Sequence, residues 1–254
     1  MWARIRVSLL RATLAALACA ACATAGPILD IAPQQLTGTR TSSVYGPTYS
    51  WNYSYHLSFQ NDTLLAQVGV ELVGADPGTA LRNQWESGVE STWSNHYDVV
   101  DGTYLYPILL DLVWVGSSPD ETVTVHAGTG GVDMLNWYTT NPSGYPNSYQ
   151  GVLAAHEVGH MIGLYDEYYG GAVDPATQFQ ATNALMADLG PVQQRYYLGM
   201  LGWLEGASGR DLALVSAPEV PEPSGSEVPE PSTIALAAIG LLALFVLRRK
   251  SVEP

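Results

Sequence analysis

Residues 156–166 read HEVGHMIGLYD, which is the pattern H-E-x-x-H-x-x-G-x-x-D. Two histidines four positions apart lie on one face of a helix, about one turn apart, so His156 and His160 can bind the same zinc ion. Glu157 lies between them, where its carboxylate can take a proton from a metal-bound water without itself binding the metal. This spacing predicts a catalytic zinc site on a helix over residues 149–164.

The end of the motif predicts a third ligand. Gly163 allows the helix to stop, because glycine tolerates the left-handed backbone that such an ending often needs. The chain can then turn back and bring Asp166 to the metal, and three protein ligands with an open fourth position are typical of a catalytic zinc site. Glu167 is the alternative ligand, but the spacing favours Asp166, and we expect Glu167 to pair with a neighbouring group. The structural alternative is a buried helix whose histidines are ordinary core residues.

Residues 151–205 resemble the metzincin clan of zinc endopeptidases, and the Asp ending is most similar to that of snapalysin-type secreted bacterial proteases. Residues 183–188, NALMAD, resemble the Met-turn of that clan, in which Met186 would form a soft apolar floor beneath the imidazoles. The resemblance implies an α/β (α+β) fold with a twisted mixed sheet, an active-site helix, a Met-turn and a C-terminal helix. It also implies a zinc endopeptidase that hydrolyses peptide bonds with a zinc-bound water activated by Glu157.

The sequence departs from the metzincin pattern at one position. Some metzincins place a tyrosine two residues after the Met-turn methionine, and this chain has Asp188 there. The resemblance therefore does not identify the group that stabilises the transition state. The four nearby candidates are Tyr168, Tyr169, Tyr196 and Tyr197, most of which we expect to be packing residues.

The N-terminus has the features of a secretory signal peptide, which we assign to residues 1–25. Three arginines precede an apolar run, and Ala-Thr-Ala at 23–25 forms a small-x-small site for signal peptidase. Both cysteines of the chain, Cys19 and Cys22, lie inside this segment, and a lipoprotein acylated at one of them is the weaker alternative. The mature protein is thus expected to have no disulfide, so that its core and any bound metal must stabilise it.

The C-terminus resembles the PEP-CTERM sorting signal of Gram-negative bacteria. VPEPS at 228–232 precedes an apolar stretch and the basic residues at 248–250, and a second VPEPS occupies 220–224. We assign 216–231 to a Pro/Glu/Ser-rich linker and 232–254 to the hydrophobic segment and basic tail. The resemblance implies cleavage by an exosortase after transient membrane association and a location outside the cell or at its surface. The alternative is a permanent transmembrane anchor.

The intervening residues, 26–215, are enough for one metallopeptidase domain. Between residues 26 and 227 the chain has four arginines against 22 acidic residues, and the whole chain carries a net charge of −14. Such a surface repels phosphates and argues against a nucleic-acid partner. We expect one catalytic Zn²⁺ and a protein or peptide substrate; preference for cationic substrates and bound Ca²⁺ are left open.

Hydrophobic periodicity predicts the order of elements along this domain. We expect a loosely structured entry at 26–50, strands at 49–60, 63–73, 104–115 and 122–127, and helices at 80–97, 149–164 and 192–204. By the resemblance, the strand at 122–127 is the candidate edge strand that binds substrate backbone. Ser148 is the expected N-cap of the active-site helix. His56, His96 and His126 have no metal-like partners at useful spacing.

Two other functions fit the same sequence. The first is a non-catalytic binding protein of the extracellular matrix or exopolysaccharide layer, although such a protein has no need of the Glu157 carboxylate. The second is a zinc amidase that acts on cell-surface polymers.

Overall fold

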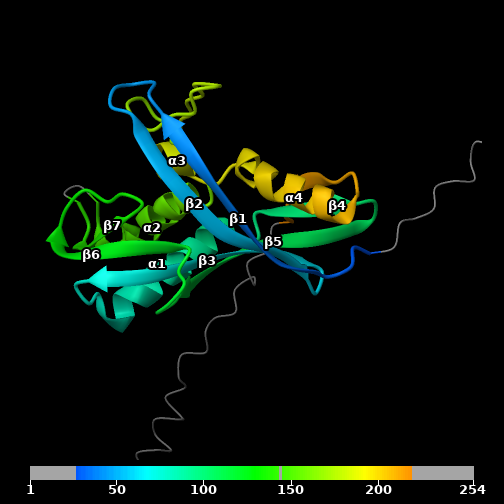
Figure 1. The fold of residues 1–254 in the computed structure, drawn as a ribbon, viewed down its shortest axis with the longest axis horizontal. Coiled ribbons are helices and arrows are strands. Elements are labelled where there is room, and N and C mark those ends of the chain that lie inside the picture. The colour runs from blue at the N-terminus through cyan, green and yellow to red at the C-terminus, as the bar shows by residue number, and fades with distance from the viewer. Residues whose placement is uncertain (1–26, 143–144, 219–254) are drawn as a thin grey trace, which may run out of the picture. The chain divides into compact units, whose positions relative to one another are not determined.

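The computed structural model describes residues 27–142 and 145–218, and within these ranges it has a mixed, curled sheet of eight strands and few helices (Figure 1). The strands follow the order β1-β2-β3-β5-β4-β8, with β6 and then β7 added beside β3. Their bounds are β1 Ile31–Ser42, β2 Tyr49–Gln60, β3 Thr63–Gly74, β4 Tyr97–Asp101, β5 Tyr104–Trp114, β6 Glu121–Thr129, β7 Asn136–Thr140 and β8 Ala213–Ser216. The predicted signal peptide, most of the linker and the hydrophobic tail lie outside the described residues.

The helices are α1 Gly78–Trp93, α2 Gln150–Met161, the short α3 Leu185–Asp188 and α4 Leu198–Ser208, with 3-10 turns at Asn147–Tyr149 and Gln194–Tyr197. This mixed α/β architecture agrees with the predicted fold class, whereas a specifically metzincin fold stays a prediction. No helix in the described part of the chain is both long and apolar enough to cross a membrane.

Strand β3 supports both halves of the sheet. Its first part pairs in parallel with β5, through Leu64 to Val70, and its last part pairs in parallel with β6, through Val70 to Gly74. Strand β6 also pairs with β7 on its other side. The prediction that residues 122–127 form a free edge strand is therefore wrong, because β7, which the sequence analysis did not identify, covers that edge.

The N-terminal segment is a strand rather than the expected loose entry. Strand β1 pairs antiparallel with β2 along most of its length, and the two form the long blue hairpin of Figure 1. Only Ile31, Ala32 and Leu36 of the twelve β1 residues have aliphatic side chains other than proline, so hydrophobic periodicity gives no signal there. Cross-strand polar pairs such as Thr39 with Asn52, at 2.8 Å, replace the usual apolar contacts.

The predicted helix 80–97 corresponds to α1, but it ends four residues early. Trp85, Val89 and Trp93 are buried at helical spacing, as the sequence predicts. Ser94 then takes an extended conformation and Asn95 a positive φ of 62°, which directs the chain into β4. The helical pattern continued to Tyr97 only because that residue is also apolar.

Helices α1 and α2 cross where two glycines meet. The Cα of Gly151 lies where a side chain at Gly88 would stand, and a Cβ added at Gly151 would lie 2.7 Å from the Cα of Gly88. Trp93 fixes the same pair of helices, since its indole N–H donates to the carbonyl of Ala155 at 2.9 Å. Helix α2, which carries the HEVGH motif, is thus held against α1 by close backbone contact.

Two predicted helix boundaries need correction. Helix α2 begins at Gln150, after a 3-10 turn, and its first turn has no side-chain cap, so the assignment of Ser148 as N-cap is wrong. The helix predicted at 192–204 is divided into a 3-10 turn from Gln194 and helix α4.

Glu121, at the start of β6, makes stability depend on pH. Burial and the neighbouring charge of Asp120 raise the pKa of Glu121 from 4.5 to about 7. The folded protein therefore binds the Glu121 proton more tightly than the unfolded chain does. The resulting stabilisation is fully present below pH 4.5 and is lost as pH rises through 7. We expect wild type to lose roughly 1–2 kcal/mol between pH 5 and 8, after allowance for partial exposure.

Urea unfolding of wild type and Glu121→Gln at pH 5 and pH 8 measures this contribution. The variant should have the weaker pH dependence and the larger free energy of unfolding relative to wild type at pH 8. Equal pH slopes in the two proteins would show that Glu121 is ionised in the folded state.

Candidate metal centre

Helix α2 presents both histidines of the motif with defined ring orientations. The Nδ1 atoms of His156 and His160 lie 2.9 Å from the backbone carbonyls of Leu185 and Leu164, respectively. Because a carbonyl oxygen only accepts hydrogen bonds, each Nδ1 carries a proton and donates it. In the neutral rings, the Nε2 atoms are therefore left with lone pairs, which are the form that binds a metal.

Asp166 joins these two rings. Its Oδ1 lies 3.3 Å from the Nε2 of His156 and 3.3 Å from that of His160, and the three atoms lie within 4.8 Å of one another. Oδ1 is buried and has no hydrogen-bond donor among the described residues. Three such atoms repel one another unless a proton on an imidazole or a metal ion lies between them, so this group could hold a metal ion.

The electrostatics of the group agree with a bound positive charge. Burial alone would lower the pKa of His160, but the adjacent Asp166 carboxylate outweighs burial and raises that pKa to about 9. Burial would raise the pKa of Asp166, but the two rings lower it below its usual range. The site is thus built around an anionic carboxylate whose charge must be balanced.

The loop after α2 brings Asp166 to the histidines. Helix α2 ends at Met161, three residues before the predicted end at 164, and Gly163 follows with a φ of 88°, in the left-handed region. The carboxylate of Asp166 is held by a hydrogen bond from the next part of the loop, in which the N–H of Ala172 donates to Oδ2 at 2.7 Å. Gly171 is required beside it, because an added Cβ would lie 2.7 Å from the Cβ of Asp166.

Glu157 faces a cavity of about 350 Å³ that the two histidines and Asp166 also line. No described residue forms a hydrogen bond with its carboxylate, although the residue is buried. Burial raises its pKa above the ordinary value, and the neighbouring carboxylates of Asp166 and Asp133 add to this effect, while the histidines oppose it. A carboxylate with a raised pKa and no partner is suited to accept a proton from a molecule in the cavity.

Residues 183–188 pack against α2. The sulfur of Met186 occupies the space that a Cβ at Gly159 would fill, and Met186 is fully buried. The neighbouring Leu185 provides the carbonyl that orients the His156 ring. Asp188 instead closes the turn, since its carboxylate accepts the N–H groups of Asn183 and Ala184 at 3.0 Å.

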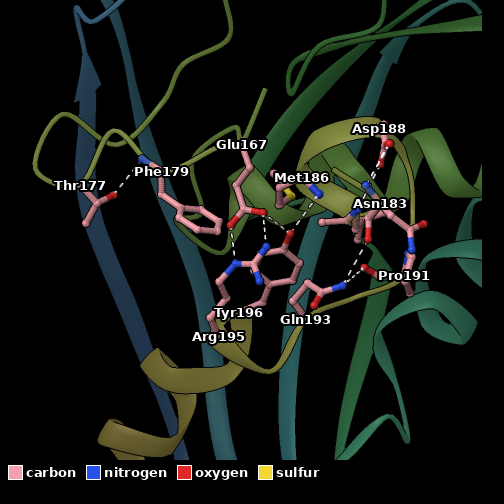
Figure 2. A network of polar contacts seen from close by, with 12 residues as sticks. Glu167, Thr177, Phe179, Asn183, Met186, Asp188, Pro191, Gln193, Arg195 and Tyr196 are labelled. Carbon is pink, nitrogen blue, oxygen red and sulfur yellow. Dashed lines mark hydrogen bonds and ion pairs between the residues drawn. The ribbon is translucent and has the colours of Figure 1, made fainter. Parts of the chain in front are cut away.

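Glu167 ties this turn to the C-terminal part of the domain rather than to the metal site (Figure 2). Its carboxylate forms two hydrogen bonds with Arg195, at 2.5 and 2.6 Å, and accepts the Tyr196 hydroxyl at 2.7 Å. Its backbone N–H donates to the carbonyl of Met186 at 2.7 Å. The expectation that Glu167 pairs with a neighbouring group therefore agrees with this geometry.

Of the four tyrosines near the motif, Tyr168 is the one that lines the cavity with the histidines. Tyr196 donates to Glu167, and Tyr197 donates to the carbonyl of Trp93 at 2.6 Å. Tyr169 is exposed and packs against Tyr45 at the tip of the β1–β2 hairpin. Only the fold distinguishes Tyr168 from its neighbours, since the four are alike in sequence.

Two segments that the sequence analysis did not connect with the site form its walls. From the hairpin come Tyr49, Ser50 and Trp51, and the Trp51 indole donates to the carbonyl of His160 at 3.2 Å. From the connection between β6 and β7 come residues 132–135. No motif marks either segment, because tertiary pairing alone brings them to the candidate metal centre.

The other three histidines lie away from this group. His56 lies 3.3 Å from Asp120, His96 contacts the carbonyl of Ser91, and His126 contacts Asn136. None belongs to a group of potential metal ligands in the part of the chain that the structure describes.

Comparison with known proteins identifies the C-terminal segment. The family model for the PEP-CTERM protein-sorting motif matches residues 227–250. This signal is recognised by exosortase and indicates export to the cell surface or exterior of a Gram-negative bacterium. No curated protein and no solved structure matches the chain.

Proposed function

We propose that this protein is an exported zinc-dependent endopeptidase. The observation that carries the proposal is the convergence of two imidazole Nε2 atoms and the orphaned Oδ1 of Asp166 next to the unpaired carboxylate of Glu157. A metal site with a purely structural role has no need of an unpaired carboxylate on the same cavity. The sorting signal supports the proposal, because it directs the protein to a place where external proteins are available as substrates.

Zinc is the metal that this set of ligands suits best. Two imidazole nitrogens and one carboxylate oxygen leave a fourth position open, which is typical of catalytic zinc. His156, His160 and Asp166 would hold the ion. When bound, zinc would supply Lewis acidity, which polarises a carbonyl group and makes water a stronger acid.

The residues of the chain would then perform the proton transfers. Glu157 would accept a proton from the attacking water and deliver it to the leaving amine. Tyr168 lines the same cavity and carries the hydroxyl that would donate a hydrogen bond to the substrate oxygen as negative charge develops. The carbonyls of Leu185 and Leu164 would keep both imidazoles in the orientation seen in the structure.

Metal content and thermal stability test the site directly. We expect about one zinc per purified chain, and we expect chelation to lower Tm by roughly 5–10 °C where free zinc had exceeded Kd about a hundredfold. Asp166→Ala removes a ligand and should abolish both the bound zinc and the response to chelator. Asp211→Ala, at an exposed position away from the cavity, is the matched control.

Hydrolysis of casein and a panel of peptide, ester and glycan substrates then distinguishes the possible activities. Cleavage of peptide bonds supports an endopeptidase, whereas cleavage only of amide bonds in cell-surface polymers would favour an amidase. A zinc-free protein without hydrolytic activity would contradict the proposal and favour the binding-protein alternative.

A further inference from the structure

The cavity beside the metal centre combines apolar walls with negative charge. Its apolar and aromatic lining includes Tyr49, Trp51, Val132, Met134, Leu135 and Tyr168. Its remaining side chains include three carboxylates, and no lysine or arginine lines it. Two of these carboxylates, from Glu157 and Asp166, are engaged by the proposed reaction, which leaves that of Asp133.

The Asp133 carboxylate is held in a fixed position by its own turn. Oδ1 accepts the backbone N–H of Leu135 at 2.9 Å, and the side-chain amide of Asn136 donates to both oxygens, at 2.9 and 3.1 Å. Two backbone hydrogen bonds between Asp133 and Asn136 close the same turn. These donors are all neutral, so they orient the carboxylate and leave its charge uncompensated.

No basic side chain of the described domain neutralises this charge. Each of its four arginines has another partner: Arg40 donates to the carbonyl of Gly163, while Arg82, Arg195 and Arg210 pair with Asp76, Glu167 and Asp101. Asp133 itself forms no ion pair among the described residues. Asp133 is exposed and lines the same cavity as Glu157 and the two histidines, so a ligand in that cavity can reach its carboxylate.

We propose that Asp133 makes this cleft selective for peptides that carry lysine or arginine close to the scissile bond. Both side chains have a long apolar stem and a cationic end, so the stem would contact the apolar wall while the end reaches the carboxylate at the rim. A glutamate in the same place would be repelled by the uncompensated carboxylate of Asp133. The inference rests on the proposed peptidase function, and it adds the class of substrate.

Peptide binding to a zinc-loaded Glu157→Gln protein tests this selectivity without relying on turnover. The probes are fluorescent peptides that are identical except for one residue, which is lysine, leucine or glutamate and is moved through each position on either side of the centre. We expect one position at which the lysine peptide binds roughly 10-fold more tightly than the leucine peptide and more tightly still than the glutamate peptide. Raising the salt concentration should reduce that difference.

Substitution of Asp133 assigns the effect to this residue. Asp133→Asn keeps the acceptor oxygen for the turn, so the fold should persist while the lysine-to-leucine affinity ratio falls about 10-fold. Asp133→Lys should reverse the preference toward glutamate. Asp211→Asn removes the same charge from the distant surface and controls for net charge.

The outcomes separate this inference from the proposed function. Lysine, leucine and glutamate peptides that bind equally at every position would overturn the role of Asp133, even if wild type hydrolyses them. A preference that persists in Asp133→Asn would also overturn it. Selective binding that Asp133 controls, without hydrolysis by wild type, would support the inference and contradict the peptidase proposal.

Discussion

Replacing Glu157 with glutamine will remove peptide hydrolysis while zinc binding persists. Glutamine has nearly the same shape, but its amide cannot accept the proton of the attacking water. Because general-base catalysis contributes about 10²–10⁴-fold, we expect kcat/KM to fall by roughly 10³-fold. The three metal ligands are unchanged, so the zinc content should stay at one per chain.

Glu71→Gln, in β3 and away from the cavity, is the matched control and should keep wild-type kcat/KM. Zinc analysis of the same preparations separates loss of the base from loss of the metal. Wild-type activity in Glu157→Gln would remove Glu157 from the mechanism. If the loss of activity were accompanied by loss of zinc, Glu157 would instead be part of the metal site.

Replacing Gly151 with alanine will destabilise the domain strongly. The new Cβ would lie 2.7 Å from the Cα of Gly88 and 2.9 Å from the carbonyl oxygen of Gln84, and both are backbone atoms of α1. Backbone cannot yield as a flexible side chain can, so the two helices must separate. Overpacking in a well-packed core typically costs 1–3 kcal/mol, and we expect about 3 kcal/mol or more here.

Helix propensity alone would have the opposite effect, because alanine is more favourable than glycine by about 1 kcal/mol in an exposed helix interior. Gly202→Ala isolates that opposing effect, since no atom lies within 4 Å of a Cβ at this position of α4. Urea unfolding should therefore show Gly202→Ala slightly more stable than wild type and Gly151→Ala far less stable. Equal stability of the two variants would mean that α1 and α2 do not touch at these glycines.

The sequence predicts much of the fold where one strand face is apolar and the other is polar. Strand β2 has the bounds that were expected, and β3 and β5 differ from expectation by one residue at one end. Asn61 and Asp62, which separate β2 from β3, both have positive φ, as a tight hairpin requires. Four strands were missed: β1 is rich in polar residues, and β4, β7 and β8 have only four or five residues each, so none of them leaves such a pattern.

The candidate site also has a part that the sequence predicts and a part that it does not. His156, Glu157, His160 and Asp166 are close in sequence, so helix geometry and one glycine turn are sufficient to predict their meeting. The cleft walls come from residues 49–51 and 132–135, which strand pairing brings together from distant parts of the chain. Single-sequence patterns do not contain that information.

The residues that orient the candidate metal ligands come from distant parts of the sequence, and this determines when during folding the site can form. Trp51 contacts the His160 carbonyl, Leu185 orients His156, and Glu167 binds both the Met186 carbonyl and Arg195. The eleven-residue motif alone therefore does not make the site, because its geometry depends on contacts that span about three quarters of the domain. During synthesis and export, the ligands emerge before Arg195, so an unfinished chain carries the motif without the scaffold that would complete the site.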